Sequence, residues 1–349
     1  MEDFDLLKRL CDCSGVSTKE TKIAEILAAE LRTFMPEVKT DRMGNVIARS
    51  CEKPDILLIA HMDETGLIAK NVTSEGFIEF EKLGGMLDQF LVQQRVMIHA
   101  KEDVPGIVTW KIDPNASRDK LKEMPVKCND LYIDTGLSKD ELLSFGVYPG
   151  TIISFDQGTT ESKDVIFGKA LDDRVGCFVA ITAARKLRGR VDFAVVFTVQ
   201  EETGLKGIQT AIRGMNPKMA IEIEITGTSD TPNLHGKPVL LAIGKGPVVN
   251  LADGGEGLTR GYTADRRLVE EIQRLKDPVK LQWKIATGGT SDASIAQVQN
   301  SGIPTLSVCV PVRYPHTPVG IVKKGDIAST AEFIEEIVIH LGKTVLRNL

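Results

Sequence analysis

The sequence contains two histidines and four carboxylates whose types and positions suit divalent-metal chemistry. They are His61, Asp172, Glu201, Glu202, Glu224 and His316. Imidazole nitrogens and carboxylate oxygens together form the mixed ligand set that zinc, cobalt or manganese accepts. A carboxylate shared by two such ions, each with one histidine and one further carboxylate, makes a site that lowers the pKa of a bridging water and polarises a carbonyl or phosphoryl oxygen. We therefore expect a hydrolytic site with two divalent metal ions.

The adjacent pair Glu201 and Glu202 adds a second function to this site. When one of two neighbouring carboxylates binds metal, the other is free to take the proton of the attacking water as a general base. The three other histidines, His99, His235 and His340, do not join the set. We expect structural or solvated roles for His99 and His340.

Each candidate residue also has an ordinary structural explanation. His61 could be a core histidine at a strand end, and Asp172 or Asp173 could cap a helix. The glutamate pair could begin a solvated helix, where the first turn favours negative charge. Glu224 could lie on the surface, and His316 could simply lie in a loop. We favour the metal site because all of these explanations would have to hold together.

The elements that must position these residues are short, continuously apolar runs. Such runs are typical of central strands that are covered by helices on both faces. Open α/β sheets place their sites just past the carboxyl ends of such strands, where the candidate residues lie. We expect helices between the runs, over 174–187, from about Ser291, and over 327–341. The apolar runs are 56–60, 193–199, 219–223 and 305–310.

The rest of the chain divides into two kinds of sequence. The spacing of Ser17 and Glu20 predicts a capping box at the start of a helix, and 41–45 predicts a hairpin turn. The stretch 67–168 has short β-branched runs separated by Gly and Pro, which favours a small β-domain. We therefore expect an α/β domain from 1–66 and 169–349, with 67–168 inserted into it.

Composition excludes several classes of function. The 349 residues carry 43 basic and 48 acidic side chains, a net charge of −5 that argues against nucleic-acid binding. No apolar run approaches the ~18 residues of a membrane helix, and the acidic N-terminus lacks the features of a signal peptide. The six scattered cysteines are typical of reduced, mostly buried thiols. We expect a cytoplasmic protein with no membrane or nucleic-acid partner.

Several motifs resemble metallopeptidase family forty-two, the co-catalytic aminopeptidases that include the tetrahedral TET-type enzymes. The site motifs are AHMDETG at 60–66, GKALDDRVG at 168–176, QEETGLKG at 200–207, GGTSDA at 288–293 and RYPHTPV at 313–319. DTG at 134–136 and GVYPG at 146–150 are similar to the family's inserted domain. The resemblance spans nearly the whole chain, with the motifs in the expected order.

The resemblance implies a fold and a set of metal ligands. The fold is a three-layer α/β aminopeptidase fold with a mixed, mostly parallel central sheet and an inserted small β-barrel domain that serves oligomerisation or as a lid. His61 would bind one metal and His316 the other, with Asp172 bridging them and Glu202 beside His316. Two divalent ions per subunit are implied, zinc or cobalt before manganese.

The same resemblance implies a reaction and partners. Glu201 would be the general base. Asp63 would orient the metal ligand His61 without binding the metal itself. The reaction would be amide hydrolysis at a free N-terminus, so the substrates would be peptides with a free amine. Self-assembly into large homo-oligomers, often dodecamers, is also implied.

One position departs from the family pattern. The family has Asp six residues before an Asp-Thr-Pro segment, whereas this chain has Glu224 before 230–232. Glutamate keeps the charge and ligand chemistry but adds a methylene, so its carboxylate reaches further from the strand. We expect Glu224 to be the other ligand of the His61 metal, with consequences for metal preference and activity.

Three other functions compete with this interpretation. A scaffold that binds peptides or assembles, with activity lost through the change at Glu224, would hold metal without turnover. A glycoside hydrolase needs a carboxylate pair around a sugar, has no use for two histidines, and is disfavoured by aromatics at 5%. Carboxypeptidases and deacylases on a related scaffold would act on substrates without a free amine.

Overall fold

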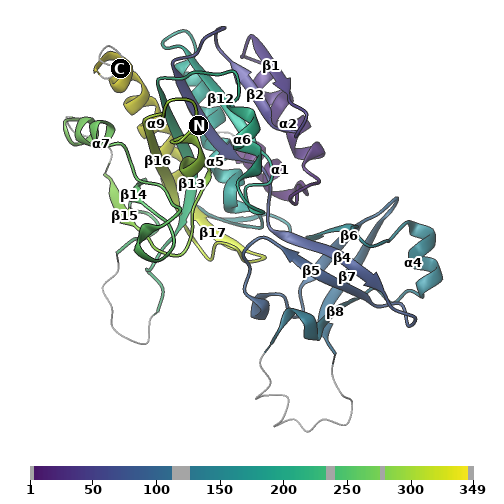
Figure 1. Cartoon of the computed structure of the whole chain (residues 1–349). Coiled ribbons are helices and arrows are strands. Elements are labelled where there is room, and N and C mark those ends of the chain that lie inside the picture. Colours follow the sequence, from purple (N-terminus) through teal and green to yellow (C-terminus); the bar gives the residue numbers. More distant parts are fainter. Residues whose placement is uncertain (1–3, 112–125, 233–239, 276–279, 345–349) are drawn as a thin grey trace.

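The computed structural model describes residues 4–111, 126–232, 240–275 and 280–344. They form an α/β part built on an 11-stranded sheet and a smaller, closed β-barrel. Figure 1 shows the barrel standing beside the α/β part. This architecture confirms the predicted α/β fold with a mixed central sheet and an inserted small barrel.

The large sheet is mixed: its four central strands are parallel, most of the strands around them pair antiparallel, and the edge strand β15 pairs in parallel with β14. Its strands run in the order β1-β2-β12-β3-β13-β16-β17-β11-β10, and β14 pairs with both β16 and β15. The central strands β12, β3, β13 and β16 are mutually parallel and contain the four predicted apolar runs. The strands are β1 (Glu37–Thr40), β2 (Val46–Arg49), β3 (Ile56–His61), β10 (Thr160–Ser162), β11 (Val165–Gly168), β12 (Phe193–Thr198), β13 (Met219–Gly227), β14 (Val248–Ala252), β15 (Gln282–Ile285), β16 (Thr305–Arg313) and β17 (Gly320–Lys323).

Helices cover both faces of this sheet, which explains why its central strands are apolar throughout. Successive side chains of β3 point to opposite faces of the sheet. Leu58 packs into one hydrophobic cluster with residues of α1, α2, α5 and α9. Leu57 packs into another with residues of α6 and α8. The α-helices are α1 (Phe4–Asp12), α2 (Thr21–Arg32), α4 (Lys139–Phe145), α5 (Leu171–Leu187), α6 (Lys206–Ala211), α7 (Arg266–Gln273), α8 (Asp292–Ala296) and α9 (Lys324–Thr344). None of these helices in the described part of the chain is long and apolar enough to cross a bilayer.

The predicted capping box near the N-terminus is wrong. Helix α2 begins at Thr21, and its N-cap residue Glu20 makes no capping hydrogen bond with its side chain. The Ser17 hydroxyl instead donates a 2.5 Å hydrogen bond to the carboxylate of Asp63. Ser17 therefore binds a residue 46 positions away in sequence and does not cap the nearby helix. The predicted hairpin turn is present, since β1 and β2 pair on either side of it.

The barrel contains six antiparallel strands in the closed order β4-β5-β8-β7-β6-β9. Its interior is a separate hydrophobic cluster that includes Leu67, Phe80 and Val108. The barrel strands are β4 (Gly66–Val72), β5 (Ile78–Leu83), β6 (Arg95–His99), β7 (Asp103–Trp110), β8 (Leu131–Asp134) and β9 (Ile152–Phe155). The short 3-10 helices are η1 (Asp88–Phe90), η2 (Cys128–Asp130) and η3 (Glu256–Leu258).

Strand pairing places the C-terminal end of the predicted insertion 67–168 in the large sheet. Strands β10 and β11 fall inside the range 67–168, yet they pair through β17 with the large sheet rather than with the barrel. Their short sequences alone do not show which sheet offers them a partner. The division into a catalytic domain and an inserted domain stays a prediction, with the last barrel strand ending at Phe155.

Candidate metal centre

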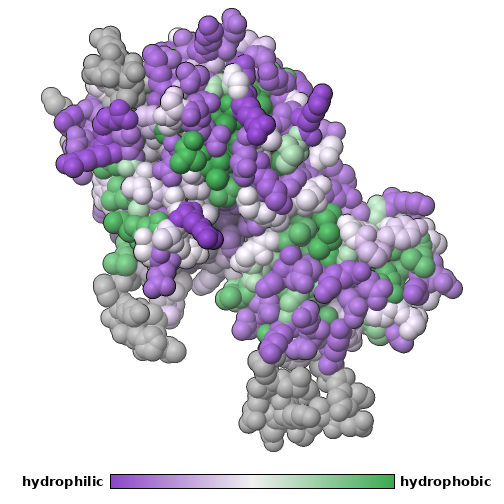
Figure 2. Space-filling view, viewed as in Figure 1, coloured by the Kyte–Doolittle hydropathy of each residue, from purple (hydrophilic) through white to green (hydrophobic). Residues whose placement is uncertain are grey.

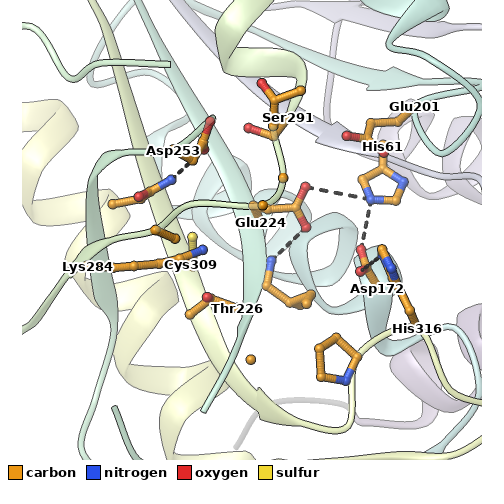
Figure 3. A pocket seen from close by; sticks show the side chains of 18 of the residues that line it. His61, Asp172, Glu201, Glu224, Thr226, Asp253, Lys284, Ser291, Cys309 and His316 are labelled. Atoms are coloured by element: carbon orange, nitrogen blue, oxygen red, sulfur yellow. Dashed lines mark hydrogen bonds and ion pairs between the residues drawn. The ribbon is translucent and has the colours of Figure 1, made fainter. Parts of the chain in front are cut away.

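The carboxyl ends of the parallel strands bring the predicted site residues together. Because parallel strands end at the same edge of a sheet, residues far apart in sequence meet there. His61 ends β3, Glu201 and Glu202 follow β12, Glu224 lies on β13, His316 follows β16, and Asp172 lies at the start of α5. All except Glu202 line one pocket of about 490 Å³. Figure 3 shows this pocket from close by, with both histidines on the same side.

The first candidate ligand group consists of His61, Asp172 and Glu224. One ligand atom from each lies within 4.8 Å of the others. The Nε2 atom of His61 is 2.9 Å from Oδ1 of Asp172 and 3.6 Å from Oε2 of Glu224. This geometry offers one imidazole nitrogen and two carboxylate oxygens to a single ion.

The second ligand group consists of His316, Asp172 and Glu202, again within 4.8 Å. The Nε2 atom of His316 is 3.1 Å from Oδ2 of Asp172 and 3.5 Å from Oε1 of Glu202. The two groups therefore share Asp172, which turns one oxygen toward each histidine. A carboxylate in this position can bridge two cations.

The backbone at the start of α5 explains why Asp172 points into the site. Its φ and ψ of −82° and 108° are extended rather than helical. The next residue, Asp173, accepts a hydrogen bond from the amide of Gly176, as a capping side chain does. The capping explanation therefore applies to Asp173 and not to Asp172.

Glu224 shows how this chain accommodates the longer side chain. Its Oε1 accepts a 2.7 Å hydrogen bond from the amide of Ile225, the next residue. This contact bends the carboxylate back toward β13, while Oε2 still faces His61 (Figure 3). The hydrogen bond from the Ile225 amide therefore compensates for the extra methylene of Glu224.

Asp63 connects the end of β3 to the segment that follows β12. Its carboxylate accepts hydrogen bonds from the amides of Glu201 and Glu202, at 2.9 and 3.3 Å, and from the Ser17 hydroxyl. The backbone carbonyl of Asp63 lies 3.1 Å from Nδ1 of His61, closer than its carboxylate at 3.5 Å. Asp63 thus orders both His61 and the glutamate pair. The role of Ser17 was not predicted, because its sequence pattern indicated a helix cap.

Burial and mutual repulsion perturb the carboxylates. Burial raises the pKa of Glu202 to about 8, and the nearby Asp172 carboxylate adds to the rise. Burial likewise raises the pKa of Glu201 and of Glu224. For Asp172, burial opposes ionisation, but hydrogen bonds from His316 and His61 outweigh it and lower the pKa. Negative charge at this site therefore lacks sufficient cationic partners.

The histidines outside the two groups have other contacts. His99 lies in the barrel, with Nδ1 3.0 Å from Asp103 and Nε2 2.8 Å from the Ser154 hydroxyl. Nε2 of His340 is 2.9 Å from the Glu271 carboxylate. His235 lies outside the described residues. His99 and His340 belong to neither ligand group.

Comparison with known proteins decides the family. A family model described as M42 glutamyl aminopeptidase matches residues 44–333. The chain belongs to the M42 glutamyl aminopeptidase family. This confirms the resemblance found in the motifs, and it makes the chain an aminopeptidase, an enzyme that hydrolyses peptide bonds.

Individual M42 relatives cover almost the whole chain. A lysyl aminopeptidase of Pyrococcus furiosus is 29% identical over 100% of this chain and 98% of its own. The structure of an aminopeptidase from Desulfurococcus kamchatkensis has a TM-score of 0.87 at 30% identity, covering 97% and 94% of the two chains. The TET1 peptidase of Pyrococcus horikoshii, which can assemble into a tetrahedron or a large octahedral shell, has a TM-score of 0.82 at 29% identity, covering 95% and 98%.

The residues of this M42 enzyme fit divalent cations. Oε1 of Glu202 is buried and has no hydrogen-bond partner in the described part of the structure. A buried carboxylate oxygen without a hydrogen bond is costly, and a cation would satisfy it. The mixed imidazole and carboxylate donors are those that zinc, cobalt and manganese accept. The observed donor atoms therefore support metal binding by both groups.

Proposed function

We propose that this aminopeptidase uses two divalent metal ions, held by the two groups that share Asp172. The observation that carries the proposal is the opposed pair of contacts made by Asp172, 2.9 Å to His61 and 3.1 Å to His316. A carboxylate placed between two histidines, each with a further glutamate, suits a co-catalytic pair of ions. Zinc and cobalt are the expected ions, with manganese as a third candidate.

Glu201 is proposed as the general base. It lines the pocket, belongs to neither ligand group, and receives no side-chain hydrogen bond from any described residue. When bound, divalent ions supply Lewis-acid polarisation of a carbonyl and a lowered pKa for water. The Glu201 carboxylate then takes a proton from the attacking water and returns it to the leaving nitrogen.

The substrates are proposed to be peptides with a free N-terminal amine. Membership of the M42 glutamyl aminopeptidase family supports this proposal, as do relatives named lysyl aminopeptidase and glutamyl aminopeptidase. The test uses metal-stripped protein with zinc, cobalt or manganese added back, and a panel of aminoacyl-nitroanilides with N-acetylated counterparts. We expect metal-dependent cleavage of the free-amine substrates alone. Two bound ions without turnover would contradict the proposal and favour a peptide-binding scaffold.

A cation in the pocket wall predicts the preferred N-terminal side chain. Lys284 lines the pocket across from His61 (Figure 3), and its ammonium makes no hydrogen bond or ion pair to any residue in the described ranges. Asp253 nearby is already engaged by Asn250 and by the amide of Tyr262. We therefore expect acidic N-terminal residues to be cleaved faster than basic ones.

Replacing Lys284 by Met tests this preference. The ratio of kcat/KM for glutamyl- over leucyl-nitroanilide should fall about tenfold or more, since a hydrogen bond to a charged group contributes about 1.5–3 kcal/mol. Lys218→Met is the matched control, because Lys218 is exposed and pairs with Asp55. An unchanged ratio in Lys284→Met would show that another residue selects the side chain.

We also propose that the chain assembles into a homo-oligomer, with a dodecamer as the expected size. A TET1 peptidase structure described as a dodecamer offers the precedent. Large apolar side chains are exposed on both parts of the molecule, including Phe90 and Tyr148 on the barrel and Trp283 and Ile285 on β15. Figure 2 shows such apolar surface on each part. Light scattering after gel filtration should give twelve times the mass of one chain, and a monomer would contradict the proposal.

A cytoplasmic location is proposed on the basis of the cysteines. All six are free, and four of them are buried. This pattern is typical of proteins in a reducing compartment.

A further inference from the structure

The barrel reaches into the metal centre through the turn that follows β5. The backbone carbonyl of Gly85 lies 3.0 Å from Nδ1 of His316, although 231 residues separate the two in sequence. A carbonyl oxygen can only accept a hydrogen bond, so Nδ1 carries the hydrogen. In a neutral imidazole this leaves the lone pair on Nε2, the atom that faces Asp172 and Glu202. The contact therefore selects the tautomer and ring orientation that metal binding requires.

The preceding residue, Gly84, packs against Glu202, the glutamate of the same group. Its φ of +96° is a conformation that glycine adopts at little cost. A Cβ atom at this position would lie 2.6 Å from Cγ2 of Thr65 and 3.0 Å from Oε2 of Glu202. The turn thus adjoins both His316 and Glu202. The described contacts of Gly84 and Gly85 include neither His61 nor Glu224.

Lys82 anchors this turn to the barrel. Its ammonium donates hydrogen bonds of 2.7 Å to the carbonyl of Met86 and 2.5 Å to the carboxylate of Asp88. Asp88 in turn accepts a hydrogen bond from the amide of Cys128, in η2. These contacts tie Met86, the residue next to Gly85, to the barrel strand β5 and to η2. Lys82 itself is only partly exposed, at 26% of its side chain.

We propose that the turn 84–86 is a positioning element for the second ligand group and that Lys82 is its positioning residue. The inference rests on the proposed two-metal function. It adds that the barrel controls the affinity of the His316 site without directly affecting the His61 site. The inserted barrel would then be part of the metal centre as well as a surface for assembly.

The test measures metal binding itself, by titrating zinc into the metal-stripped full-length protein in a calorimeter. We expect Lys82→Met to retain one tight equivalent and to weaken the second, by up to the ~10–100-fold that loss of the Gly85 contact to His316 itself would cost. Gly84→Ala should weaken the same site, because the new methyl group meets Thr65 and Glu202. Lys82→Arg, which keeps the charge and the donors, should restore the second equivalent.

Lys70→Met serves as the matched control. Lys70 is another barrel lysine, half exposed and 3.7 Å from Glu81, with no described contact to the turn. We expect it to bind two equivalents as the wild type does. Circular dichroism and gel filtration establish that each variant remains folded and assembled, and Lys82→Met decides the question if Gly84→Ala does not fold.

The outcomes separate the two proposals. Wild-type protein that binds fewer than two equivalents would overturn the two-metal function and this inference with it. If the wild type binds two equivalents, the result for Lys82→Met decides the positioning role. Weakening both sites alike, or weakening neither, would overturn the positioning role alone. Selective loss of the second equivalent supports it.

Discussion

Replacing Glu201 by Gln is expected to lower kcat about 10²–10⁴-fold while leaving both metal ions bound. The loss corresponds to the usual contribution of a general base. Gln has nearly the same shape as Glu but cannot take a proton from water at neutral pH. Because Glu201 belongs to neither ligand group, the metal sites should stay intact. Steady-state kinetics and metal analysis by mass spectrometry on the same preparation check both parts.

Glu202→Gln is the matched control for this prediction. Glu202 is the adjacent residue, and its amide also donates to Asp63, but its carboxylate belongs to the His316 group. We expect this variant to lose metal from that group as well as activity. If Glu201→Gln also lost metal, the assignment of Glu201 as base rather than ligand would be refuted.

Replacing Asp172 by Asn is expected to remove both metal ions and all measurable peptidase activity. Asp172 is the residue that the two ligand groups share, and each of its oxygens faces a different histidine. The amide of Asn carries no charge and offers only one oxygen, so neither group keeps its complete ligand set. Metal analysis should find well under one equivalent, against two in the wild type.

The neighbouring residue provides a close control. Asp173 is fully buried and lies in neither ligand group. Burial raises its pKa, which favours the protonated form, and Asn resembles that form. Asp173→Asn should therefore keep both ions, with its side-chain oxygen still accepting from the Gly176 amide. One ion remaining in Asp172→Asn would show that Asp172 serves a single site and is no bridge.

Much of the fold could be predicted from local patterns. The runs at 56–60, 193–199, 219–223 and 305–310 became β3, β12, β13 and β16, because short, continuous apolar segments favour strands that helices cover on both faces. The apolar periodicity over 174–187 likewise became most of α5. These elements depend on side chains close in sequence, which the sequence displays directly.

Patterns that depend on distant partners were harder to interpret. The spacing of Ser17 and Glu20 indicated a helix cap, yet the Ser17 hydroxyl binds Asp63. The short strands β10 and β11 looked like part of the insertion, yet β17 gives them a place in the large sheet. In both cases a competing tertiary partner determined the outcome, and local propensity does not encode such partners.

The candidate site likewise has features that the sequence shows and features that only folding creates. The sequence by itself determined which residue types are available, namely two histidines and several carboxylates after apolar runs, together with the family motifs that contain them. Only the tertiary structure decided that Asp172 faces both histidines, that Glu224 folds back onto the Ile225 amide, and that the carbonyl of Gly85 orients His316. A backbone carbonyl has no signature in a sequence, since every residue carries one. Its role arises only when folding brings it to a ligand 231 residues away.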